Sequence, residues 1–264
     1  MTKQRKRPIG VFDSGLGGLT AVRALREVLP REDLVYLGDT GRVPYGTRSE
    51  STIRQYAAED LAFLDRFEVK AVLVACGTVS SVALDAMEKR PGCPVYGVVD
   101  PAVQAALAAT KSGRIGVLGT PASIRAGAYE RKLRAGGAEV FPMACTLFVP
   151  LVEAGHIGRQ DPILKLAAED YLEPLRRERV DTLILGCTHY PLIAETIADL
   201  CPGVSLIDSG REAARALAAT LPEREEQGEG ECRFYVTDTV ENFSRIGSMF
   251  LQSPIGDRVE RVVL

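Results

Sequence analysis

The sequence has little excess positive charge and no long uninterrupted apolar segment. Its formal net charge is -3 with a pI near 5.6, which argues against the basic surface that nucleic-acid-binding proteins usually carry. A basic cluster at residues 3–7 precedes an apolar run that Asp13 and Gly15 soon interrupt, whereas a signal peptide or a membrane span needs a longer run. We therefore expect no nucleic-acid partner and no membrane segment, and we expect the basic cluster to be a solvated tail.

The chain also lacks the cysteine and histidine spacing of disulfide scaffolds and zinc sites. Its six cysteines include no close Cys-x-x-Cys pair, so we expect reduced thiols in a cytoplasmic protein. Cys187 and His189 supply half of a metal site, but His156 stands alone and no second pair of ligands is visible, so we expect no metal. Four cysteines in apolar or loop contexts are expected to be buried or uninvolved: Cys93, Cys145, Cys201 and Cys232.

Short aliphatic runs alternate with helix-like stretches along the 264 residues, of which 46% are hydrophobic and 25% are charged. This alternation is typical of strands buried in a parallel sheet and joined by crossover helices. The sequence therefore predicts an α/β fold, long enough for one large or two ordinary domains. The predicted strands are Ile9–Phe12, Leu34–Leu37, Ala71–Ala75, Val95–Val99, Ile115–Leu118, Glu139–Phe141, Thr182–Leu185, Val204–Ile207 and Cys232–Val236. The predicted helices are Thr20–Leu29, Ser51–Phe67, Val79–Lys89, Ala102–Thr110, Ser123–Ala135, Ile163–Glu178, Leu192–Leu200 and Gly210–Leu221, and residues 223–231 are expected to form an exposed loop.

A faint internal repeat relates the two halves of the chain. Ile9-Gly-Val-Phe-Asp-Ser matches Ile115-Gly-Val-Leu-Gly-Thr at an offset of 106, and Cys76 matches Cys187 at an offset of 111. The repeat predicts two related α/β halves. Ligands of open parallel sheets bind beyond the carboxyl ends of the strands, so the residues there are expected to meet in one cleft: Asp13-Ser14-Gly15, Asp39-Thr40, Cys76-Gly77-Thr78, Gly119-Thr120 and Cys187-Thr188-His189.

Two thiols in equivalent places suggest a reaction that needs the same group on both faces of one small molecule. Removing a proton from one face and returning one to the other inverts a stereocentre, whereas a hydrolase needs only one nucleophile. A Cys/His nucleophile pair of the protease type is an alternative, but it leaves Cys76 without a role. Gly15-Leu-Gly-Gly18 lacks the spacing of a phosphate-binding loop, and a tight turn into a helix is the simpler interpretation.

At these residues the chain resembles the cofactor-independent glutamate racemases of the aspartate/glutamate racemase family. The resemblance covers nearly the whole chain, and its motifs are specific as a set. They are Pro8-Ile-Gly-Val-Phe-Asp-Ser-Gly-Leu-Gly-Gly-Leu19, Tyr36-Leu-Gly-Asp-Thr40, Val43-Pro-Tyr-Gly46, Gly116-Val-Leu-Gly-Thr120, Leu151-Val-Glu153, Gly186-Cys-Thr-His-Tyr-Pro-Leu192 and Asp208-Ser-Gly210.

The resemblance implies two similar parallel-sheet α/β domains related by pseudo-symmetry, with the active site in the cleft between them. Residues 1–97 and 209–264 would form the first domain and residues 98–208 the second. The implied enzyme is an isomerase that interconverts L- and D-glutamate without pyridoxal phosphate or any other cofactor. It would supply D-glutamate, a D-amino acid, for peptidoglycan and so serve cell wall biogenesis and cell shape. A cytoplasmic homodimer is also implied.

The resemblance also implies a role for each residue of the site. Cys76 and Cys187 would be the acid/base pair, with Asp13 supporting Cys76 while Glu153 and His189 support Cys187. The implied catalytic set is therefore Cys76, Cys187, Asp13, Glu153 and His189. The implied substrate-binding set is Asp13, Ser14, Tyr45, Gly46, Gly77, Thr78, Thr120, Thr188 and His189.

One departure from the family pattern concerns Gly77, which stands where the family usually has asparagine. The chain thus lacks an amide side chain at a substrate-contact position, and losing one such hydrogen bond costs about 1–3 kcal/mol. We expect an active enzyme whose efficiency the glycine can lower. The alternative is a catalytically weak amino-acid-binding or regulatory protein of the same fold. An aspartate racemase is a lesser alternative, because such enzymes usually have an acid where His189 stands.

Overall fold

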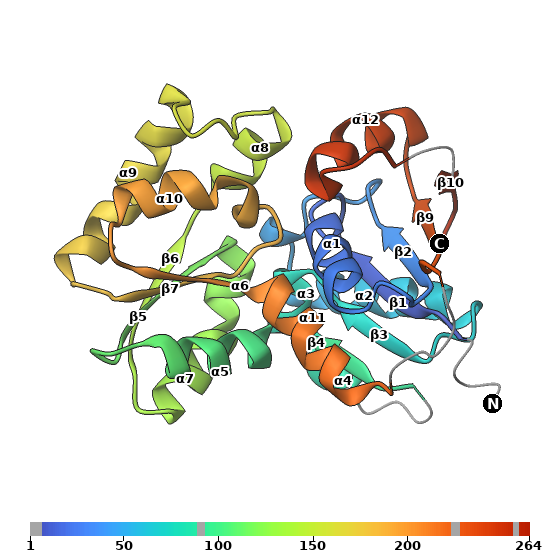
Figure 1. Cartoon of the computed structure of the whole chain (residues 1–264), viewed down its shortest axis with the longest axis horizontal. Coiled ribbons are helices and arrows are strands. Elements are labelled where there is room, and N and C mark those ends of the chain that lie inside the picture. The colour runs from blue at the N-terminus through green and yellow to red at the C-terminus, as the bar shows by residue number, and fades with distance from the viewer. Residues whose placement is uncertain (1–6, 89–92, 223–227, 256–258) are drawn as a thin grey trace.

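A computed structural model describes the chain except for residues 1–6, 89–92, 223–227 and 256–258. Most of the N-terminal basic cluster, the end of the helix predicted at residues 79–89 and part of the loop predicted at residues 223–231 therefore lie outside the described residues. Two lobes lie side by side in Figure 1, each built around one sheet. No helix in the described part of the chain is both long enough and apolar enough to cross a bilayer.

The first lobe contains a six-stranded parallel sheet with the strand order β10-β9-β2-β1-β3-β4. The residues of its three central strands are fully buried because helices cover both faces. Burial on both faces explains why the sequence shows uninterrupted aliphatic runs in these strands. The strands are β1 (Ile9–Asp13), β2 (Leu34–Gly38), β3 (Ala71–Val74), β4 (Val95–Gly97), β9 (Cys232–Val236) and β10 (Val259–Arg261).

The second lobe contains a four-stranded parallel sheet with the strand order β6-β5-β7-β8. This order repeats the order β2-β1-β3-β4 of the first sheet, so β1 corresponds to β5 and β3 to β7. Cys76 and Cys187 therefore follow equivalent strands, and the predicted α/β fold with two similar parallel sheets is confirmed. The strands are β5 (Arg114–Gly119), β6 (Glu139–Ala144), β7 (Thr182–Leu185) and β8 (Ser205–Asp208).

The helices cover the faces of the two sheets, and α8 and α12 lie at the top of the two lobes in Figure 1. The first lobe carries α1 (Leu19–Val28), η2 (Tyr45–Thr47), α2 (Glu50–Asp65), α3 (Gly77–Val82), α4 (Leu84–Met87) and α12 (Val240–Leu251). The second carries α6 (Pro121–Ala126), α7 (Ala128–Ala135), α8 (Phe148–Glu153), α9 (Pro162–Arg177), η3 (Tyr190–Ile193) and α10 (Ala194–Leu200).

Two helices exchange places between the lobes. The helix α5 (Val99–Ala109) follows β4 of the first sheet but packs against α7, β7 and β8 of the second. The helix α11 (Ser209–Thr220) follows β8 of the second sheet but packs mainly against α1 of the first. They also pack against each other, so they join the lobes. The predicted domain limits at 97/98 and 208/209 fall where the chain enters these helices, and the division into two domains stays a prediction.

Several predicted boundaries were wrong for local reasons. The strand predicted to end at Val99 ends at Gly97, and Val99 begins α5. The helix predicted at residues 123–135 is broken at Gly127, which has a left-handed conformation. The helix predicted from residue 79 begins at Gly77 and is broken at Ala83. Four elements of the described chain were missed: η2, α8 and β10, which are short, and α12, which contains the weak helix formers serine and glycine.

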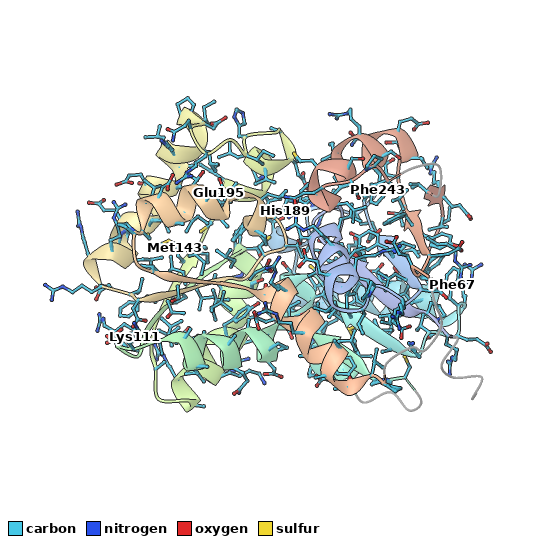
Figure 2. The ribbon with its side chains drawn as sticks, viewed as in Figure 1. Phe67, Lys111, Met143, His189, Glu195 and Phe243 are labelled. Carbon is cyan, nitrogen blue, oxygen red and sulfur yellow. The ribbon has the colours of Figure 1, made fainter. Side chains whose placement is uncertain are left out.

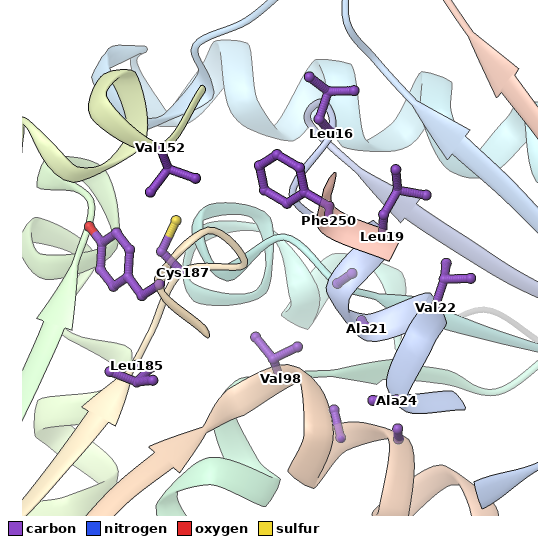
Figure 3. Packing of buried hydrophobic residues seen from close by; sticks show 14 of the residues in the cluster. Leu16, Leu19, Ala21, Val22, Ala24, Val98, Val152, Leu185, Cys187 and Phe250 are labelled. Atoms are coloured by element: carbon purple, nitrogen blue, oxygen red, sulfur yellow. The ribbon is translucent and has the colours of Figure 1, made fainter. Parts of the chain in front are cut away.

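One hydrophobic cluster extends through both lobes. Figure 3 shows Leu19 and Val22 of α1, Phe250 of α12 and, on the other side, Val152 of α8 and Cys187. All five side chains are buried. The thiol of Cys187 therefore lies against a packed core, and its surroundings are fixed by elements of both lobes.

We expect Gly127→Ala to lower the free energy of unfolding by about 1–2 kcal/mol, because a side chain strains left-handed backbone. Gly127 has φ 64° and ψ 18°. The measurement is urea denaturation of both proteins. Gly158→Ala is the matched control, since an added Cβ there approaches no atom of the described chain closer than 3.9 Å. An equal loss of stability in both variants would contradict the argument from strain.

Candidate active site

A cavity of about 310 Å³ lies between the lobes, and both Cys76 and Cys187 line it. Figure 2 places His189 at the junction of the two lobes. The predicted convergence is present for four of the five strand ends, which contribute Ser14, Cys76, Thr120 and Cys187 among others to the lining, whereas Asp39 and Thr40 after β2 do not line the cavity. The lining residues are Ser14, Gly15, Val43, Pro44, Tyr45, Gly46, Thr47, Cys76, Gly77, Thr78, Thr120, Pro121, Cys145, Thr146, Val149, Pro150, Glu153, Cys187, Thr188 and His189.

Cys76 lies at the turn between β3 and α3, as the residue that precedes the first turn of the helix. Its side chain is 4% exposed, and its Sγ lies 3.5 Å from Oγ of Ser14. Burial, and then the negative charge of Asp13, raise the pKa of the Cys76 thiol to about 12, although hydrogen bonds from Val79 and Ser14 act in the opposite direction. The resting form of Cys76 is therefore the neutral thiol, and its thiolate is a strong base.

Asp13 lies behind the cavity wall, not in it. The side chain is 1% exposed, and its Oδ2 accepts a hydrogen bond of 2.9 Å from the backbone N–H of Gly15. Its Oδ1 has no hydrogen-bond partner among the described residues. Burial raises the pKa of Asp13, while the charge of His189 and backbone N–H groups lower it. Asp13 therefore acts on the Cys76 thiol through its charge, with no hydrogen bond between the two side chains among the described contacts, and its support of Cys76 in catalysis stays a prediction.

Cys187 belongs to a hydrogen-bonded chain that ends at the cavity mouth. Its Sγ lies 3.8 Å from Nδ1 of His189, and Nε2 of His189 lies 2.9 Å from Oε1 of Glu153, the last residue of α8. Burial lowers the pKa of His189, but hydrogen bonds to Cys187 and Glu153 outweigh it and raise the pKa to about 10. The imidazole is therefore protonated at neutral pH, so it stabilises negative charge on the neighbouring sulfur. The ring of Phe250 packs edge-on against it at 5.0 Å.

The predicted substrate-binding residues, apart from Asp13, all line the cavity. They come from both lobes, and hydroxyl groups dominate among them. Oγ1 of Thr78 in the first lobe lies 2.9 Å from Oγ1 of Thr120 in the second. Thr120 also precedes α6 as its N-cap, where Oγ1 accepts a hydrogen bond from the backbone N–H of Ser123. Donors from two lobes therefore face one space of the size that a small polar ligand needs.

Gly77 lies where the two thiol-bearing loops touch. A Cβ added at this position would be 2.2 Å from the carbonyl oxygen of Gly186, the residue before Cys187. A second close approach involves Gly17, where a Cβ would be 2.1 Å from Oγ1 of Thr188. Both glycines therefore allow backbone of the first lobe to approach the Cys187 loop, and the Gly15–Gly18 segment is a tight turn into α1, as predicted.

Part of the cavity wall was missed by the sequence interpretation. Thr146, Val149 and Pro150 lie on or beside α8, which was not predicted. Cys145, expected to be an uninvolved thiol, also lines the cavity, and burial and the nearby Cys187 raise its pKa. The position of Cys145 directly after β6 is the signal that identifies it, because the other strand-end residues were found by that rule.

The alternative chemistries find little support in the geometry. In the described part of the chain, no group of three or more histidine, cysteine, aspartate or glutamate side chains is arranged to hold a metal ion. His156, the second histidine, bonds through Nδ1 to Asp161 at 2.8 Å and does not line the cavity. The Cys187 and His189 pair does exist, but it shares the cavity with Cys76. A one-nucleophile mechanism leaves this second thiol without a role.

Comparisons with known proteins identify a consistent group of relatives. The family model described as "Asp/Glu/Hydantoin racemase" matches residues 19–217. The chain is 46% identical to the glutamate racemase of Aquifex aeolicus over 96% of this chain and 95% of that protein. It is similar to the crystal structure of Francisella tularensis glutamate racemase in complex with D-glutamate, with a TM-score of 0.90, 39% identity and 98% coverage of each chain. The Thermus thermophilus glutamate racemase structure gives a TM-score of 0.88 with 42% identity and 99% coverage of each chain.

We expect Glu153→Gln to lower the pKa of His189 by about 1–3 units, because a carboxylate next to an imidazolium favours the charged form by that amount. NMR titration of the two histidine rings measures it, with His156 as the internal control. In the unmodified protein this raised pKa contributes stability that is complete below about pH 6.5 and is lost as the pH rises through about 10. An unchanged His189 titration in the variant would show that Glu153 does not hold the proton there.

Proposed function

The chain belongs to the Asp/Glu/hydantoin racemase family, and from this premise we infer that it interconverts L- and D-glutamate. The observation that carries the inference is the pair of thiols, Cys76 and Cys187, which follow equivalent strands of two similar sheets and line one cavity. Relatives of 46% and 39% identity that are glutamate racemases support glutamate as the substrate.

The proposed reaction is proton exchange at Cα from opposite faces. One thiol, as the thiolate, removes the Cα proton, and the electron pair of the broken C–H bond is left on a planar carbanion. The other thiol then donates its proton to the opposite face, so the configuration is inverted and one proton has been gained and one lost. The reverse direction exchanges the roles of the two cysteines. No oxidation or reduction occurs, and the chemistry of the protein's own side chains is sufficient for the balance.

The two thiols have different charged neighbours. Asp13 lies near Cys76 and disfavours negative charge there, whereas protonated His189 lies beside Cys187 and favours it. We therefore propose that Cys76 rests as the neutral acid, and that the positive charge of His189 stabilises the thiolate of Cys187 when Cys187 acts as the base. Glu153 keeps the proton on His189.

Substrate orientation is assigned to the donors that line the cavity. Ser14, Thr78, Thr120 and Thr188 would bind the amino and carboxylate groups through hydroxyl and backbone groups, together with Tyr45 and Gly46. Preorganised donors of this kind stabilise the negative charge that develops on the carboxylate when Cα loses its proton. The cationic His189 adds an attraction for an anionic substrate.

The biological setting is part of the same proposal. D-Glutamate would be supplied for peptidoglycan, and the enzyme would act in the cytoplasm as a homodimer. The structure contains no disulfide among the described cysteines, which supports a reducing compartment.

We expect the protein, without added cofactor, to convert either enantiomer of glutamate into the other in heavy water and to incorporate deuterium at Cα. Cys76→Ala and Cys187→Ala are each expected to abolish inversion, because each removes the proton-transfer group of one face. Cys93→Ala is the matched control, as Cys93 does not line the cavity. Polarimetry follows inversion and NMR follows deuterium. Full inversion by both cavity variants would sink the two-thiol mechanism.

The same experiment distinguishes the alternative that Gly77 suggests. An amino-acid-binding or regulatory protein would bind glutamate in calorimetry while neither inverting it nor exchanging its Cα proton. Inversion of aspartate at a higher kcat/KM than glutamate would favour the aspartate alternative.

We expect Gly77→Ala to lower kcat/KM by about tenfold or more, because the added Cβ would meet the Gly186 carbonyl oxygen at 2.2 Å and must displace one of the two thiol loops. Displacement of reacting groups by about 1 Å costs up to about a hundredfold in rate. Steady-state kinetics measures the change, and circular dichroism checks the fold. A gain of activity in Gly77→Asn would show instead that the missing amide limits this enzyme.

A further inference from the structure

Two fully buried carboxyl groups lie behind the part of the cavity wall formed by Tyr45. Asp39 follows β2 and Asp60 lies on α2, and both are 0% exposed. Tyr45 is 1% exposed and belongs to the segment of residues 43–47, all of which line the cavity. Neither carboxyl group lines the cavity itself, so the proposed reaction gives Asp60 no role.

The hydrogen bonds of this cluster require one more proton than the phenol can supply. Oη of Tyr45 contacts Oδ2 of Asp39 and lies 3.2 Å from Oδ2 of Asp60. A phenol has one proton to donate. Asp39 uses the same Oδ2 to accept a bond of 2.5 Å from Nε of Arg42, and its other oxygen accepts a bond of 2.8 Å from Thr237. Because every one of these partners donates to Asp39, Asp39 is a carboxylate and takes the only proton of the phenol. The contact between the phenol and Asp60 then needs a proton supplied by Asp60.

The charges around Asp60 also favour its neutral, protonated form. The ion pairs described for Asp39 and Asp60 both go to Arg42, which lies 3.1 Å from Oδ1 of Asp60 and also pairs with Glu59. One guanidinium, held over the ring of Tyr56 at 4.1 Å, therefore faces three carboxyl groups. Burial, and then the charge of Asp39, raise the pKa of Asp60 well above its usual range.

We propose that Asp60 is a positioning residue that acts as the neutral acid, donating a hydrogen bond to the phenol of Tyr45 and thereby fixing the substrate-binding segment of residues 43–47. Tyr45 passes its own proton to Asp39, so the order of donors is Asp60, Tyr45, Asp39. The next residue, Gly46, touches the other lobe, since an added Cβ there would be 2.9 Å from Cβ of Thr120. Asp60 thus holds residues 43–47 on the side that faces away from the cavity, while Thr120 of the other lobe packs close to Gly46.

The test compares Asp60→Asn with Asp60→Ala. An asparagine amide can donate to the phenol and accept from Arg42 without ionising, so we expect the KM for glutamate to stay within about twofold in Asp60→Asn. Asp60→Ala leaves the buried phenol and Arg42 without this partner, so we expect KM to rise about tenfold or more with a smaller change in kcat. Glu59→Gln is the matched control, as it removes a partly exposed carboxylate that contacts the same Arg42, and its KM should stay near that of the unmodified protein.

A second readout does not depend on turnover. A buried acid with a raised pKa contributes stability that is complete below about pH 3.8, the usual value, and is lost as the pH rises toward the raised pKa. Thermal denaturation should therefore show the unmodified protein losing stability relative to Asp60→Asn as the pH increases. Infrared difference spectra of the two proteins at neutral pH should show a carboxylic acid C=O band that Asp60→Asn lacks.

Three results would overturn the proposal. They are a stability of Asp60→Asn below that of the unmodified protein at neutral pH, a KM in Asp60→Asn as high as in Asp60→Ala, and an unchanged KM in both variants. The kinetic part rests on the proposed function, whereas the denaturation and infrared parts do not. If the unmodified protein does not turn over glutamate but the acid band is present, the function fails and the protonation state of Asp60 stands.

Discussion

The close contact of two loops, one from each lobe, is the constraint on which the site depends. The loop that carries Cys76 and the loop that carries Cys187 meet at Gly77 and Gly186, where there is no room for even one additional carbon atom. Each loop follows the third strand of its repeat. Because the strand order is the same in both sheets, a single pseudo-symmetric packing brings both strand ends together. The position of the sulfur atoms is therefore set by close packing of backbone against backbone.

Desolvation then determines the chemistry of this enclosed space. Burial raises the pKa of Cys76 and of Asp13, and it would lower that of His189 if Glu153 and Cys187 did not oppose it. The site consequently keeps one neutral thiol on one side and a cation beside the other thiol. Desolvation also determines the protonation behind Tyr45, where the buried carboxyl groups of Asp39 and Asp60 share the one guanidinium of Arg42. At the thiols and behind Tyr45 alike, one of several neighbouring acidic groups keeps its proton, because burial leaves no water to solvate several negative charges.

The sequence was informative wherever the chemistry depends on strand ends. Parallel strands are recognisable as aliphatic runs, and the residues that follow Val74 and Leu185 include both thiols, so periodicity alone located them. Roles such as that of Glu153 came from the family resemblance, because α8 is six residues long and has no readable period. The strand-end rule singled out Asp39, but its cluster with Asp60 could not be predicted, since an acidic residue on a helix is normally solvated. Only the tertiary structure shows that Asp60 faces inward beside Arg42.

The exchange of α5 and α11 between the lobes bears on the origin of the repeat. Each helix leaves the sheet to which it is joined and covers the opposite sheet. A chain of half this length with the same topology would therefore leave its last helix without a sheet of its own to cover. Such a half would be complete only as a pair of identical chains that swap this helix. Fusing the pair into one polypeptide would make the exchange internal, and the two halves would then be free to diverge, as Asp13 beside one thiol and His189 beside the other have done.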